Sequence, residues 1–128
     1  MTTDSLKIEN INSRKDFQKI DIQKRKTESQ RIKLKYPDRI PLIIFKDPKS
    51  SLPQINRYKY LIPGDLSLAQ FIQVIRKKIK LTPEKGIFIF TEKNNLVRIS
   101  DYIAMIYSKH KNEDGFLYLT YYEENTFG

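Results

Sequence analysis

Hydrophobic residues recur along this chain with two spacings, one helical and one extended. The clearest helical stripe begins at Leu68 and repeats every three or four residues as far as Ile79. Ser67 and Gln70 stand three residues apart just before and inside that stripe, a pair typical of a capping box at a helix start. We therefore expect one long amphipathic helix from Leu68 to about Ile79.

Strands are predicted where β-branched and aromatic residues follow one another between turn residues. These segments are Arg39–Phe45, Tyr58–Ile62, Gly86–Phe90, the short pair Leu96–Val97, and Phe116–Tyr121. Gly86–Phe90 is almost continuously apolar, so we expect it to be a central strand buried on both faces. Pro41 lacks an N–H and is expected near a strand start or at an unpaired edge.

Two further helices are predicted around these strands. A basic helix capped by Asp21 is expected to run to Tyr36, where Pro37 ends it, and another, capped by Ser100, is expected to reach about His110. The order is then a helical region followed by ββαββαβ. One long helix crossing a mixed sheet is the arrangement of ubiquitin. We predict an α+β fold, a ubiquitin-like β-grasp with two additional N-terminal helical segments.

The length of 128 residues suits one domain. We expect residues 1–16 to form a flexible extension and residues 17–36 the N-terminal helical segment. Residues 37–122 would form the β-grasp core, and residues 123–128 a flexible tail.

Composition argues against catalysis. The chain has no cysteine and only one histidine, so disulfides, thiolate metal sites, a cysteine nucleophile and imidazole clusters are excluded. We expect no enzyme, no metal and no cofactor. The net charge of +9 and the pI near 9.7 favour acidic partners. Lys24–Lys26 and Arg76–Lys78 are the densest basic clusters. A solvated helix face explains each most simply, with anionic lipid, acidic peptide and nucleic acid as alternatives.

The last residue is Gly128, behind a short polar tail. Glycine has no Cβ to crowd a reacting carbonyl, and its backbone is free enough to enter a narrow enzyme cleft. Many terminal glycines are nevertheless frayed ends without chemistry, so this position alone does not identify an acyl donor.

Several motifs match one protein family in order and spacing. They are Lys24–Ile32, Asp38–Pro41, Lys59–Pro63, Gln70–Phe71 with Ile75–Lys77, Pro83–Lys85 with Ile87–Phe90, Asp114–Tyr118, and Glu124–Gly128. Together they cover roughly Asp21 to Gly128. In these motifs the chain resembles the autophagy-related protein eight family of ubiquitin-like modifiers, the group of the GABA-receptor-associated protein and microtubule-associated light chain three.

The resemblance implies a substrate of a conjugation pathway. Members are carried as thioesters on activating and conjugating enzymes and then joined through the C-terminal glycine, here Gly128, to phosphatidylethanolamine. A delipidating cysteine protease reverses that step. Such a protein is cytoplasmic and, after lipidation, lies on the autophagosome membrane. Many members carry residues after the glycine that the protease removes; if the gene ends at Gly128, we expect conjugation without that cleavage.

The resemblance also implies a peptide-docking surface along Lys59–Ile62 for receptors with aromatic-x-x-aliphatic motifs. An unpaired strand side accepts an extended peptide, whose alternate side chains would enter pockets on one face. Matching positions assign a first pocket to Glu28, Ile32, Pro41, Lys59, Leu61 and Phe116. They assign a second pocket to Tyr60, Ile62, Pro63, Leu66, Phe71, Val74 and Lys78. Acidic residues flanking the motif are expected to be attracted by Arg25, Arg39 and Arg57.

Some alternatives stay open. Leu66, Phe71 and Val74 are also explained as core residues. A non-conjugated basic adaptor would bind acidic cytoskeletal tails or RNA with strong salt dependence, although nucleic acid is the less expected partner. An ordinary ubiquitin-like domain would continue beyond Gly128. The sequence also departs from the family at Thr91–Ile99, one residue longer than usual.

Overall fold

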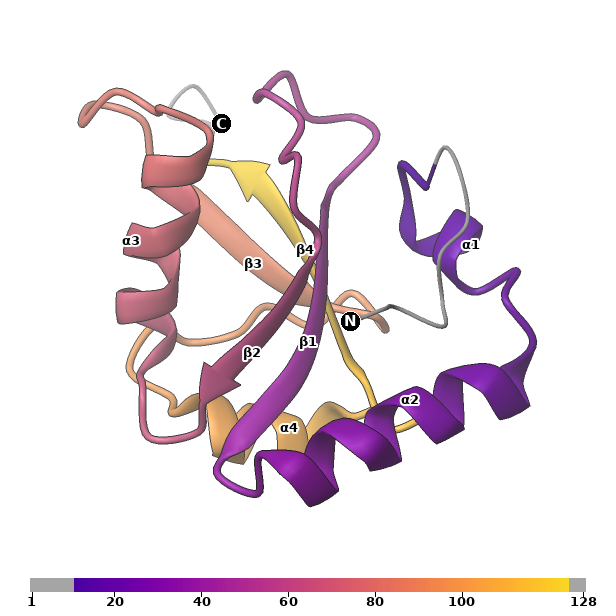
Figure 1. Ribbon diagram of the computed structural model, residues 1–128. Coiled ribbons are helices and arrows are strands. Elements are labelled where there is room, and N and C mark those ends of the chain that lie inside the picture. The colour runs from indigo at the N-terminus through magenta and orange to yellow at the C-terminus, as the bar shows by residue number, and fades with distance from the viewer. Residues whose placement is uncertain (1–10, 125–128) are drawn as a thin grey trace.

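The computed structural model describes residues 11–124, which form one mixed sheet with helices on both faces (Figure 1). The strand order is β2-β1-β4-β3. The central strands are β1 (Arg39–Lys46) and β4 (Leu117–Glu123), which run parallel. On the outer sides, β2 (Lys59–Pro63) pairs antiparallel with β1, and β3 (Ile87–Thr91) pairs antiparallel with β4.

The helices are α1 (Arg14–Phe17), α2 (Ile22–Lys35), α3 (Leu68–Lys78) and α4 (Ile103–His110). In Figure 1, α3 lies along one side of the sheet and α1 on the other, while α2 and α4 lie near the end of the sheet where β1 begins. None of these helices has both the length and the apolar character needed to cross a membrane.

Side chains of β1 are buried on both faces, because successive residues of a strand point to opposite sides. Leu42 and Ile44 belong to a large cluster that includes the apolar stripe of α3 and Ile103 and Ile106 of α4. On the other face lies a second cluster. Its buried members are Phe17, Ile20, Ile32, Ile43, Phe45, Phe116 and Tyr118. Both faces of β1 therefore need a covering layer.

Two predicted helix starts are confirmed. The Ser67 hydroxyl accepts from the Gln70 N–H (3.2 Å), and the Gln70 side chain accepts from the Ser67 N–H (2.9 Å). Asp21 caps α2 by accepting from the Gln23 N–H at 3.1 Å. The placement of Pro41 near a strand start is also confirmed, because the pairing of β1 with β4 begins one residue later.

The prediction that Gly86–Phe90 forms a central strand is wrong. The observed strand, β3, lies at the edge of the sheet, and Phe88 is 37% exposed. Ile87 and Ile89 point into the core, whereas Phe88 points outward, so the apolar residue types conceal an ordinary alternation. No strand forms at Leu96–Val97 either; this part of the described chain makes only an isolated bridge from Leu96 to Phe90.

The predicted cap of α4 is also wrong. The helix begins at Ile103, after Tyr102, and no side chain caps it. Backbone carbonyls take that role, because Ile103 N–H donates to Leu66 C=O (2.8 Å) and Ala104 N–H donates to Gly64 C=O (2.9 Å). Ser100 is therefore not needed as a cap, since the turn between β2 and α3 satisfies the first donors of α4.

Glu92, directly after β3, binds the helix α1 and the residue that follows it. Its carboxylate accepts hydrogen bonds from Arg14 (3.1 Å) and Gln18 (2.9 Å), and from Asn112 (2.9 Å). Burial alone would raise the pKa of Glu92, but these hydrogen bonds and the charge of Arg14 lower it. The helix α1 begins at Arg14, inside the segment 1–16 for which the sequence predicts a flexible extension. Residues 1–10 and 125–128 lie outside the described residues, and the domain boundaries stay a prediction.

A buried ion pair ties α2 to the turn before β4. Arg25 Nη1 lies 2.5 Å from Asp114 Oδ2, and the Asp114 side chain is fully buried. The Phe116 N–H (2.8 Å) and the Tyr118 hydroxyl donate to the same carboxylate. The Ser29 hydroxyl donates to the Asp114 carbonyl (2.5 Å). Each charge of the pair is therefore compensated inside the protein.

Removing one member of this pair should be costly. We expect Arg25→Ala or Asp114→Ala to lower the free energy of unfolding by about 3–5 kcal/mol, because the remaining charge stays buried. Urea unfolding would measure the loss, and Lys24→Ala, at an exposed neighbour, should change it by less than about 0.5 kcal/mol. A double variant whose loss equals the sum of the single losses would contradict coupling between Arg25 and Asp114.

Candidate functional site

β2 is an edge strand, with β1 on one side and no strand of the described chain on the other. Ile44 N–H donates to Tyr58 C=O at 2.9 Å, which fixes the alternation of the antiparallel ladder. By that alternation, the backbone groups of Lys59 and Leu61 point away from β1. Pro63 has no N–H and limits this open edge at its far end.

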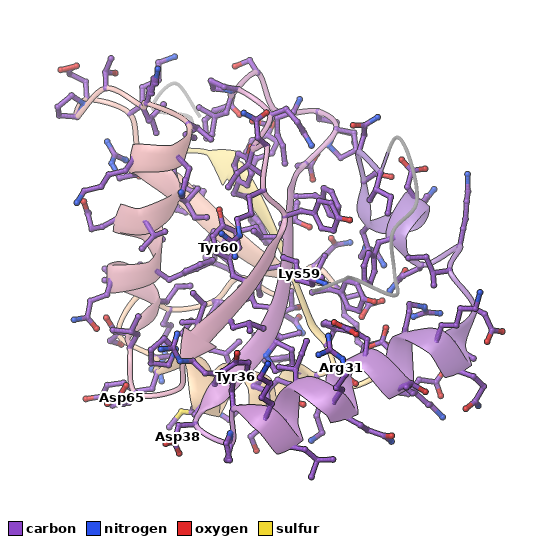
Figure 2. All side chains as sticks on the ribbon, in the orientation of Figure 1. Arg31, Tyr36, Asp38, Lys59, Tyr60 and Asp65 are labelled. Carbon is purple, nitrogen blue, oxygen red and sulfur yellow. The ribbon has the colours of Figure 1, made fainter. Side chains whose placement is uncertain are left out.

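The side chains of β2 divide between the two faces of the sheet. Lys59 and Leu61 lie toward α2, whereas Tyr60 lies toward α3; Figure 2 shows Lys59 and Tyr60 on opposite sides of the strand. The candidate pockets therefore lie on opposite faces, not on one face as expected from the sequence. Anchors three residues apart in an extended peptide also point to opposite faces, because three is an odd spacing.

The residues predicted for the first pocket come together on the α2 side of the sheet. Ile32 and Phe116 are buried in the second cluster, and the half-buried Leu61 packs against them. Pro41 is buried in β1. Among these apolar side chains, Leu61 is the accessible one, and it covers buried residues of the second cluster.

Charged side chains border the first pocket. The Glu28 carboxylate is only 2% exposed and lies 2.6 Å from Arg31 Nη2 and 3.6 Å from Lys59 Nζ. Figure 2 shows Arg31 on α2 facing the side of β2 that carries Lys59. The Lys59 ammonium is therefore held at the rim of the pocket, beside a carboxylate.

The residues predicted for the second pocket lie on β2, on α3 and in the turn between them. Tyr60 and Phe71 meet edge to face, with ring centroids 5.6 Å apart, and Ile62 belongs to the same buried cluster. Phe71 has no exposed surface, so it is a core residue beneath the pocket. The more accessible members are the half-buried Pro63, Leu66 and Val74 and the exposed Lys78.

The three predicted arginines are not equivalent. Arg39 and Arg57 are exposed beside β2 and border an open pocket of about 370 Å³. Its lining residues are Tyr36, Arg39, Arg57, Tyr60 and Leu61. Arg25, in contrast, is buried against Asp114 and is not brought to this surface. Tyr36 was missed from the sequence, although an exposed aromatic residue directly before Pro37 was the available signal.

The Tyr60 hydroxyl is buried and has no hydrogen-bond partner among residues 11–124. Burial raises the pKa of this phenol against the opposing charge of Arg57. Tyr121, in the same cluster, differs because its hydroxyl donates to the Pro53 carbonyl at 2.5 Å. The residues predicted for the second pocket therefore include one unsatisfied polar group.

A mixed sheet with parallel central strands and a helix across one face places the chain among ubiquitin-like proteins. The family described as "Autophagy protein Atg8 ubiquitin like" matches residues 24–128. The chain is 58% identical over 106 residues to autophagy-related protein 8 of Schizosaccharomyces pombe, covering 83% of this chain and 87% of that protein. It is 54% identical over 107 residues to autophagy-related protein 8d of Arabidopsis thaliana, covering 84% and 88%.

The crystal structure of Trypanosoma brucei ATG8 is similar with a TM-score of 0.81 and 36% sequence identity, covering 92% of this chain and 100% of that one. The chain belongs to the Atg8 family. It is therefore a ubiquitin-like autophagy protein, a modifier and not itself an enzyme. Lipid conjugation and membrane association are expected for this family.

The absence of a partner for the Tyr60 hydroxyl among the described residues can be tested directly. Tyr60→Phe should leave the free energy of unfolding unchanged or raise it by about 1 kcal/mol, because a buried group without a partner is removed. Tyr121→Phe is the matched control and should lower it by about 1 kcal/mol, since a hydrogen bond is lost. Equal losses in both variants, measured by urea unfolding, would show that Tyr60 has a partner in solution.

Proposed function

We propose that this protein is conjugated through Gly128 to phosphatidylethanolamine and acts in autophagosome formation by recruiting cargo receptors with aromatic-x-x-aliphatic motifs. The observation that carries the recruiting role is the open edge of β2, with the residues predicted for one pocket on each face of the sheet beside it. The family match extends to residue 128, which supports the conjugation. Gly128 itself lies outside the described residues.

In this proposal, other proteins catalyse the conjugation and its reversal. Activating and conjugating enzymes would carry the chain as a thioester, and a cysteine protease would later cut the lipid amide. Two acyl chains give stable anchoring, at roughly 0.8 kcal/mol per buried methylene. The protein would then pass from the cytoplasm to the autophagosome membrane.

Docking would add the peptide to β2 as a further strand. Its main chain would bond to the outward-facing groups of Lys59 and Leu61, and its two anchors would enter the pockets on opposite faces. We expect micromolar affinity, about −8 kcal/mol, because a short disordered peptide must be ordered on binding. Acidic flanking residues would face Arg39, Arg57 and Lys59.

The adaptor alternative receives less support from the described residues. It relies on the basic cluster Lys24–Lys26, but the central member, Arg25, is buried against Asp114. A polyanion would therefore meet a weaker basic surface there than the sequence indicates.

The conjugation is tested at the last residue. Gly128→Ala should leave the fold intact and sharply reduce the lipidated form, because the added methyl group crowds the reacting carbonyl. Gel mobility and mass spectrometry of the membrane-bound pool would measure it. Ser108→Ala, at an exposed position of α4, is the control. Wild-type lipidation of the Gly128→Ala variant, at the same attachment site, would refute the proposal.

The docking surface is tested by charge reversal. Lys59→Glu should weaken an acid-flanked aromatic-x-x-aliphatic peptide about tenfold or more and reduce the salt dependence of binding, because attraction becomes repulsion. Calorimetry at two salt concentrations would measure both. Lys93→Glu makes the same charge change on an exposed turn away from β2 and should have little effect. Unchanged affinity in the Lys59 variant would place the peptide elsewhere.

A further inference from the structure

Arginine side chains donate to two outward-facing backbone carbonyls of β2, those of Lys59 and Leu61. Arg39 Nη1 donates to the Leu61 carbonyl at 3.1 Å. Arg57 Nε donates to the Lys59 carbonyl at 3.2 Å, with its guanidinium 5.5 Å from the centre of the Tyr60 ring. One arginine comes from β1 and the other from the segment before β2, so two different parts of the chain converge on one edge.

A docked peptide strand would need the space that these guanidinium groups fill. A neighbouring strand lies about 4.8 Å away, and its N–H groups approach the edge carbonyls to about 2.9 Å. The nitrogens of Arg39 and Arg57 already stand at nearly that distance from the Leu61 and Lys59 carbonyls. Docking must therefore move both side chains, and each loses one hydrogen bond when it moves.

Displacement leaves two positive charges beside the new strand. A carboxylate on the peptide gives a displaced guanidinium a stronger partner than the carbonyl it has lost, because both groups are charged. A peptide with neutral flanks gives no such replacement. The hydrogen bond that each arginine gives up when the edge carbonyl is exposed is then not replaced by an ion pair.

Resting on the peptide docking proposed above, we propose that Arg39 and Arg57 form a removable cover on the β2 edge that selects acid-flanked peptides and rejects neutral ones. Each arginine has opposite effects on the two kinds of peptide. It opposes strand addition through its hydrogen bond to the edge carbonyl, and it favours binding only where a carboxylate receives it. The cover also protects the edge from pairing with unrelated strands when no ligand is bound.

The test uses two peptides with one aromatic-x-x-aliphatic core, one preceded by three acidic residues and the other by three serines. Arg39→Ala and Arg57→Ala should each bind the serine-flanked peptide about three- to tenfold more tightly than the wild type, the size expected for one hydrogen bond. The same variants should bind the acid-flanked peptide more weakly by a similar factor. Calorimetry on the full chain measures these affinities for the wild type and both variants.

Lys35→Ala is the matched control. Lys35 is exposed at the end of α2, and its ammonium lies 5.5 Å from the ring of Tyr36, which borders the same pocket. Its removal subtracts one charge but uncovers no carbonyl, so the affinity for the serine-flanked peptide should not change. Thermal unfolding should show all three variants folded, since the substitutions are at exposed positions.

The possible results distinguish a failure of the proposed arginine cover from a failure of the proposed docking site. Unchanged or weaker binding of the serine-flanked peptide in both arginine variants would overturn the cover while leaving the docking site in place. An equal gain in Lys35→Ala would also overturn it, because net charge would then explain the effect. If the wild type and every variant bound neither peptide, the docking site itself would be refuted, and the cover with it.

Discussion

Burying β1 on both faces requires a hydrophobic layer on each side of the sheet, and the chain supplies the two layers from different helices. The helices α3 and α4 cover one face, and the segment containing α1 and α2 covers the other. β2 pairs with β1 on one side only, so both layers end beside it. The open edge of β2 is thus a consequence of how β1 is buried.

Burial also decides what each arginine does. Arg25 lies buried between α2 and the turn before β4, where Asp114 compensates its charge. Arg25 therefore contributes to the stability of the fold. Arg39 and Arg57 remain exposed and donate to backbone carbonyls, which are weaker partners than a carboxylate. Of the three arginines, Arg25 therefore stabilises the fold, whereas Arg39 and Arg57 can exchange their hydrogen-bond partners. Only the exposed pair suits recognition.

Local sequence signals predicted the elements well, because their causes lie within a few residues. The capping box of Ser67 and Gln70 is one such signal. The order of strands in the sheet depends on distant pairing, so Gly86–Phe90 was wrongly placed at the centre. The start of α4 depends on carbonyls in another turn. The arginine contacts at the β2 edge were hidden for the same reason, since Arg39 and Leu61 are far apart in the sequence.

The sheet order also has a mechanical consequence. β4 leads toward the C-terminus and β2 carries the open edge, and β1 alone connects them within the sheet. A pull between a tethered tail and a held ligand would load the parallel ladder in which Leu42–Lys46 faces Leu117–Tyr121. Force along the strands acts on that ladder in shear, so its hydrogen bonds resist together instead of peeling apart one after another. The sheet would thereby bear tension well between the lipid anchor and the ligand that are proposed above.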